Sequence, residues 1–288
     1  MSYDLHLHFD KGVTERDFLE YFAGRRHFTA RGNEVVYQNP DTTVGFFLRY
    51  ELSKGFLSRK SLAAAHFELN YFRPSFYGLE AQIELSALVT RFAPRIEDPQ
   101  INGMGQGPYS GDGFLRGWNY GNTFAVGAIT ASNPQHKVVT MPTDKLLTAW
   151  KWNYNKPQLS AEVGERQFVP SIMTVAVANT PSLVVVWALG MPVVLPKVDY
   201  VLVGREESGV KRYGLAPWSD VLVQVRRAGI DVSSDPLDIQ YPVTPDPIAR
   251  WVAEIREVDL KTLPRLSLSE IIDSAILEAA TRRQSQPP

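Results

Sequence analysis

The chain has 288 residues, of which 30 are Lys or Arg and 31 are Asp or Glu, so its formal net charge at pH 7 is −1. Because this balance supplies no strong field of one sign, we expect neither nucleic acid nor a membrane surface as its partner. The absence of cysteine excludes disulfides, thiolate chemistry, zinc–cysteine sites and iron–sulfur clusters.

The first ninety-odd residues predict an antiparallel sheet with helices packed on one face. Residues 3–9 alternate between apolar and polar side chains, which is typical of a half-buried strand. Thr14 and Asp17 have the spacing of a capping box, which predicts a helix that ends at Gly24. A meander of short strands and a second helix should follow. The expected strands are 26–30, 34–38, 44–50 and 65–72, and the expected helix is 77–92.

Residues 99–127 combine glycine and aromatic side chains at unusual density, with eight of the chain's twenty glycines. Glycine is entropically costly in regular structure, so such a stretch needs positive φ or close backbone approach. We interpret it as an ordered junction between two closely associated halves, residues 1–98 and 99–288. Residues 114–128 are expected to be helical, with the glycines letting another backbone approach closely.

The remainder predicts a second α+β half. Thr143 should cap a helix that Pro157 ends or restarts, and Ser267 with Glu270 should open the last helix as a capping box. The longest apolar run, residues 183–189, is too short to cross a bilayer, and we expect a cytoplasmic location. The strands expected between these helices are 168–178, 183–189, 191–195, 198–203 and 237–241, and the other helices are 219–227 and the segment after Pro245.

A metal-dependent hydrolase is one alternative function, because His6 and His8 alternate along the first strand and share a face. Amidohydrolase-type barrels and related phosphoesterases begin with such a pair. They need further histidines from later strands, and this chain has none after His136. We therefore predict no metal ligand and no cofactor. The carboxylates of Glu80 and Glu84 are expected on a solvated helix surface.

A second alternative is a small-molecule sensor that uses the glycine-rich junction. Gly103, Gly105 and Gly107 lack the context of a phosphate-binding loop, since no Gly-Lys-Ser/Thr follows. No Ser-His-Asp set can be assembled either, so no catalytic residue is predicted. Polar and aromatic side chains of the junction, with one exposed ring of a later helix, are the candidate binding residues. They are Tyr109, Asp112, Arg116, Trp118, Asn119, Asn122 and Trp152.

Several phrases together resemble an uncharacterised family of bacterial proteins. They are the opening residues 3–10, the segment Phe67–Pro74, residues 103–109 with 114–119, and residues 150–153. The similarity spans most of the chain. It implies a weak likeness to the immunity proteins of secreted toxin systems, which act by binding and occluding a toxin.

The sequence therefore favours an α+β protein that binds another protein without catalysing a reaction. A cognate bacterial toxin is the partner that the resemblance implies. An immunity protein needs a complementary surface and no reacting residue, which fits a chain with aromatic-rich ordered loops.

Overall fold

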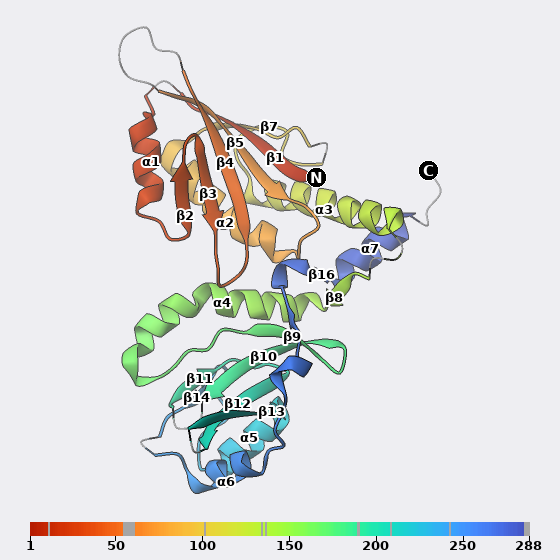
Figure 1. Ribbon diagram of the computed structural model, residues 1–288. Helices are drawn as coiled ribbons and strands as arrows, with labels where there is room; N and C mark the ends of the chain where they lie inside the picture. The colour runs from red at the N-terminus through yellow and green to blue at the C-terminus, as the bar shows by residue number, and fades with distance from the viewer. Residues whose placement is uncertain are drawn as a thin grey trace. The chain divides into compact units, whose positions relative to one another are not determined.

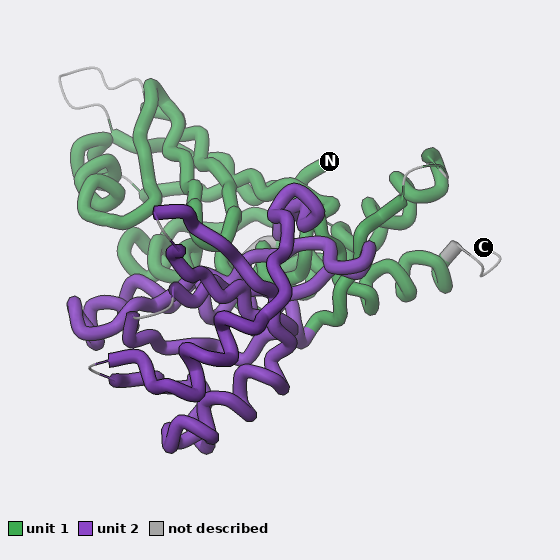
Figure 2. The backbone as a smooth tube through the Cα atoms, turned by 60° about the horizontal axis from the view of Figure 1, so that its bottom comes forward, with its two compact units in different colours: residues 1–143, 269–288 green, residues 144–268 purple. Residues whose placement is uncertain are grey.

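The computed structural model describes residues 1–10, 12–53, 61–100, 102–133, 135, 137–188, 191–207, 209–241 and 243–284 (Figure 1). The chain divides into two compact units, residues 1–143 with 269–288 (unit 1) and residues 144–268 (unit 2; Figure 2). Helices and largely antiparallel sheets make up both units, so the predicted α+β class is confirmed. The sequence suggested a boundary at residues 98–99, whereas the structure keeps residues 99–127 inside unit 1.

Unit 1 is built on one antiparallel sheet, in the order β2-β3-β4-β5-β1-β6-β7. The predicted meander is confirmed in β2 to β5. The strands are β1 (Ser2–His8), β2 (Phe28–Arg31), β3 (Glu34–Gln38), β4 (Gly45–Leu52), β5 (Leu62–Asn70), β6 (Arg95–Glu97) and β7 (Gln106–Gly107). The helices of the unit are α1 (Glu15–Ala23), α2 (Phe76–Phe92), α3 (Gly111–Ser132) and α7 (Ser274–Gln284).

The two faces of this sheet differ as the alternation of β1 predicts. Tyr3, Leu5 and Leu7 are fully buried, and the ring of Phe114 from α3 meets Tyr3 edge-on at 5.2 Å. Asp4, His6 and His8 point to the opposite face and stay half-buried. One face therefore forms the core with the helices, while the other carries the ionisable side chains.

The carboxylate of Asp98 organises the glycine-rich loop before α3. It accepts hydrogen bonds from the Tyr3 hydroxyl and from the backbone N–H groups of Gln100 and Met104, the latter two at 2.9 and 2.7 Å. A Cβ on Gly103 would lie 1.8 Å from an oxygen of this carboxylate, so only glycine fits there. The glycine-rich stretch is thus packed around a buried acid inside unit 1, and it does not join two halves as the sequence predicts.

Helix α3 spans the predicted helical segment and lies close to the loop and the sheet. A Cβ on Gly117 would lie 2.6 Å from the Tyr3 hydroxyl oxygen and 2.7 Å from the Cα of Gly103. A Cβ on Gly121 would meet the ring of Tyr71. The expectation that these glycines admit another backbone is confirmed at Gly117.

The end of the chain returns to unit 1 and differs from the sequence prediction. In place of a capped helix from Ser267, residues 268–270 form a 3₁₀ turn, β16 (Ile271–Asp273) pairs in parallel with β8 (Val139–Met141), and α7 begins only at Ser274. Asp273 is fully buried and accepts hydrogen bonds from the N–H and hydroxyl of Ser75, both at 2.7 Å. This carboxylate holds the N-terminus of α2, where an anion complements the helix dipole.

Unit 2 contains a mixed sheet in the order β13-β12-β10-β9-β15. Helix α4 (Thr143–Val163) runs through Pro157 instead of ending there. In the turns before Pro157, Trp152 donates a hydrogen bond to the carbonyl of Pro170 and Lys156 donates one to the hydroxyl of Ser171. The other elements are β9 (Met173–Val177), β10 (Thr180–Ala188), β11 (Val193–Leu195), β12 (Tyr200–Glu207), β13 (Val210–Pro217), α5 (Trp218–Arg227), β14 (Leu237–Ile239), α6 (Asp246–Glu254), β15 (Arg265–Leu266) and 3₁₀ turns at 164–166 and 260–262.

Within the described ranges, none of the helices is both long enough and apolar enough to cross a lipid bilayer.

The fit of α3 against the loop makes Gly117→Ala a test of the fold. The added methyl must displace the Tyr3 hydroxyl or the backbone of Gly103, so we expect the free energy of unfolding to fall by about 1–2 kcal/mol, even after the gain in helix propensity. Urea unfolding measures this. The control is Gly24→Ala, whose Cβ meets nothing within 4 Å and should leave the unfolding free energy unchanged.

Buried tyrosines should make unit 1 sensitive to alkaline pH. Burial, with the neighbouring carboxylates Asp98 and Glu80, raises the pKa of Tyr3 and Tyr37 far above the ordinary value of about 10. Because the raised pKa belongs to the folded state, stability is complete below about pH 10 and is lost as the pH rises further. We expect part of the tyrosinate absorbance at 295 nm to appear only together with the loss of circular dichroism. Full ionisation of all tyrosines in a still-folded chain would contradict this.

Candidate functional site

The polar residues predicted in the junction lie mostly on the outer face of α3. Asp112, Arg116 and Asn119 are exposed, and Tyr120 and Phe124 continue the same stripe with 45% and 63% of their surface exposed. Helix α7 lies beside α3 (Figure 1), and its Arg283 guanidinium stands 4.5 Å above the ring of Tyr120. We call these six residues the α3 outer surface. The sequence analysis missed Tyr120, Phe124 and Arg283, although the spacing of 116, 120 and 124 was a signal.

Two of the predicted aromatic residues point inward. Trp118 is fully buried, and a Cβ on Gly78 would lie 2.7 Å from its ring. Tyr109 is half-buried, and its hydroxyl lies 3.4 Å from the carbonyl of Gln82 and 3.3 Å from the hydroxyl of Ser86. Burial raises the pKa of Tyr109. Trp118 packs between α3 and α2, which leaves it unavailable to a ligand from solvent, and Tyr109 packs on α2 from the loop before α3.

Asn122 is also buried and binds the backbone of the turn between β5 and α2. Its Oδ1 accepts from the N–H groups of Phe72 and Arg73 at 2.8 and 3.2 Å, and its Nδ2 donates to the carbonyl of Arg73 at 2.8 Å. Phe72 has a positive φ of 61°, an uncommon conformation for a non-glycine residue. The amide therefore stabilises a strained turn.

Trp152 lies in unit 2, apart in sequence from the junction. It is half-buried and borders an open groove of about 860 Å³ between α4 and the segments at 196–199 and 235–236. The groove has charges of both signs, and one Lys145–Asp199 ion pair of 2.6 Å closes part of its wall. The predicted binding residues are therefore not gathered into one site.

The expectation for Glu80 is wrong. This side chain is fully buried, and its Oε1 accepts hydrogen bonds from Tyr37, Asn39 and Thr42 at 2.7, 2.8 and 3.0 Å. Glu84 lies one turn further on and forms an ion pair with Arg25. Because α2 packs against the sheet through this face, the carboxylate stabilises the β3–β4 turn.

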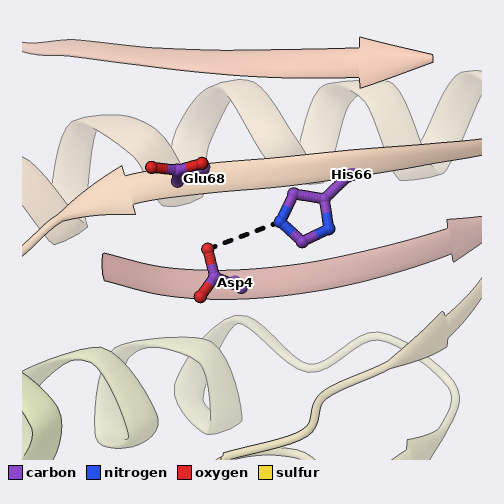
Figure 3. Close-up of side chains that lie close together, drawn as sticks. All are labelled: Asp4, His66 and Glu68. Carbon is purple, nitrogen blue, oxygen red and sulfur yellow. Dashed lines mark ion pairs between the residues drawn. The ribbon is translucent and has the colours of Figure 1, made fainter. Parts of the chain in front are cut away.

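The ionisable face of the sheet brings together residues from neighbouring strands. Asp4 on β1 lies opposite Glu68 on β5, and His6 lies opposite His66. The Nε2 of His66 is 3.5 Å from Oδ1 of Asp4 (Figure 3), and the Nδ1 atoms of His66 and His6 are 3.2 Å apart. We call these four residues the histidine–carboxylate block.

His6 and His8 themselves have different partners, although they share the face that the sequence predicts. His8 pairs with Glu97 on β6 at 3.2 Å, whereas His6 contacts His66 on β5. The two imidazoles of β1 therefore contact different neighbouring strands, His6 contacting β5 and His8 contacting β6. His136 lies outside the described residues.

Comparison with known proteins adds no relative: no protein-family model, curated protein or solved structure matches this chain.

Asn119 and Asn122 allow a matched test of which side chain supports the fold. We expect Asn122→Ala to lower the free energy of unfolding by about 2–4 kcal/mol, because three backbone hydrogen bonds are lost at a buried position. Asn119→Ala, on the exposed side of the same helix, should change it by less than about 0.5 kcal/mol. Chemical denaturation of both variants measures the difference, and equal losses would contradict the assignment.

Proposed function

We propose that this chain is a non-enzymatic binding protein whose partner is another protein, and that it acts in bacteria as an immunity protein that occludes a cognate toxin. The observation that carries the proposal is the α3 outer surface. Phe124 and Tyr120 expose large rings on this helix, and a partner that covered them would remove their apolar area from water.

The charges around these rings indicate what the partner would present. Neither Arg116 nor Arg283 forms an ion pair with a carboxylate of the described residues. The guanidinium of Arg283 stacks on the ring of Tyr120. Arginine beside aromatic rings is the composition enriched at protein–protein interfaces. A protein surface with an apolar centre and flanking carboxylates is the complementary occupant.

The rigidity of the helix favours binding with little loss of entropy. Gly117 and Gly121 fit against the loop and Tyr71, and Asn122 fastens the inner side of the helix to the β5–α2 turn. The exposed side chains therefore stand on a preorganised support, which lowers the free-energy cost of ordering them on binding.

The test uses the product of a toxin-like reading frame next to the gene, purified and mixed with the chain. We expect a stable complex and loss of the toxin's activity. Phe124→Ser and Tyr120→Ala should each weaken binding at least tenfold, because truncating a central interface ring costs about 2 kcal/mol or more. Titration calorimetry measures the affinity.

The matched control is Val223→Ser on α5, which removes an apolar side chain that is 44% exposed in unit 2. It should bind the toxin as the unaltered chain does. If the chain ignores the toxin and turns over a substrate, or if Val223→Ser weakens binding as much as Phe124→Ser, the proposal is wrong.

A further inference from the structure

The histidine–carboxylate block places an unfavourable charge arrangement on one face of the sheet. Asp4 and Glu68 are directly opposite each other on antiparallel strands, and like charges in this position destabilise a sheet. Arg49 on β4 lies opposite His66, but it is bound to Glu34 at 2.7 Å. A bound cation would therefore reduce the repulsion between the carboxylates of Asp4 and Glu68.

The unused ligand atoms point to what that cation is. Within the described part of the chain, the Asp4 carboxylate accepts from the Ser2 hydroxyl, at 3.1 and 3.3 Å to its two oxygens, and contacts His66. The carboxylate of Glu68 makes neither a hydrogen bond nor an ion pair with any residue that the structure describes. One oxygen from each and one imidazole nitrogen of His66 lie within 4.8 Å of one another.

We propose that Asp4, His66 and Glu68 bind a divalent transition-metal cation, and that His6 is a positioning residue for His66. Ligand atoms at about 2.0–2.1 Å from one tetrahedral Zn²⁺ lie about 3.4 Å apart, so side-chain rotations that move the ligand atoms by about 1 Å each close the site. One imidazole with two carboxylates suits zinc and its neighbours better than magnesium or calcium, which favour oxygen alone.

His6 supplies the outer contact that metal-bound histidines usually have. When Nε2 of His66 binds the cation, its proton is on Nδ1, and Nδ1 of His6 is 3.2 Å away as the acceptor. This hydrogen bond fixes the tautomer and the ring orientation of His66. Because the three side chains are half-buried and not fully enclosed, water can be the fourth ligand.

The experiment is calorimetric titration of the full chain with ZnCl₂ in a buffer that does not chelate metals. We expect one ion per chain, with Mg²⁺ binding far more weakly. His66→Ala and Glu68→Gln should each lower the Zn²⁺ affinity at least tenfold. His6→Phe should lower it by about tenfold, and His6→Asn, which restores an acceptor, should recover most of the loss.

His8→Ala is the matched control, because His8 shares the strand and face but pairs with Glu97. It should retain the affinity and the stoichiometry of the unaltered chain. The proposal is overturned if Zn²⁺ binds more weakly than about 1 mM, if Mg²⁺ binds equally well, or if His8→Ala loses as much affinity as His66→Ala. Circular dichroism of each variant checks folding, and Glu68→Gln keeps the test decisive if His66→Ala misfolds. None of these results depends on whether a toxin binds.

Discussion

Unit 1 depends on the hydrogen bonds that the Asp98 carboxylate accepts from Tyr3 and from the glycine-rich loop. One buried carboxylate joins the first strand, through Tyr3, to the backbone at Gln100 and Met104. Three donors to one anion satisfy groups that burial would otherwise leave without partners. The resulting loop fits under α3 only because Gly103 and Gly117 have no side chains. The direction of α3, and hence of its exposed rings, follows from this packing.

Elsewhere in unit 1, other buried side-chain acceptors also hold distant backbone segments in place. Asn122 binds the β5–α2 turn, Asp273 binds the start of α2, and Glu80 binds the β3–β4 turn. Each pairs one side chain with groups that are distant in sequence or strained in conformation. Polar residues in the interior of unit 1 therefore specify geometry, whereas the half-buried ionisable side chains lie on the other face of its sheet.

Local patterns predict much of this fold from the sequence. The alternation of β1 and the capping box at Thr14 act within a few residues, and both are confirmed. Long-range partners are not visible in such patterns. Glu80 looked solvent-exposed because its three donors come from another segment, and β16 looked helical because its pairing partner β8 is more than a hundred residues away. Asn122 and Trp118 could be recognised as important, but their inward direction depends on how α3 packs.

The return of the C-terminal segment to unit 1 sets an order of assembly. Residues 144–268 form a contiguous compact unit, whereas the first unit needs β16 and α7 from the far end of the chain. During translation unit 2 can fold once it has left the ribosome. Val126 stays uncovered until Ile272 and Ala280 pack on it. The uncovered apolar surface of α3 makes the nascent chain vulnerable to misassociation until residues 271–280 emerge.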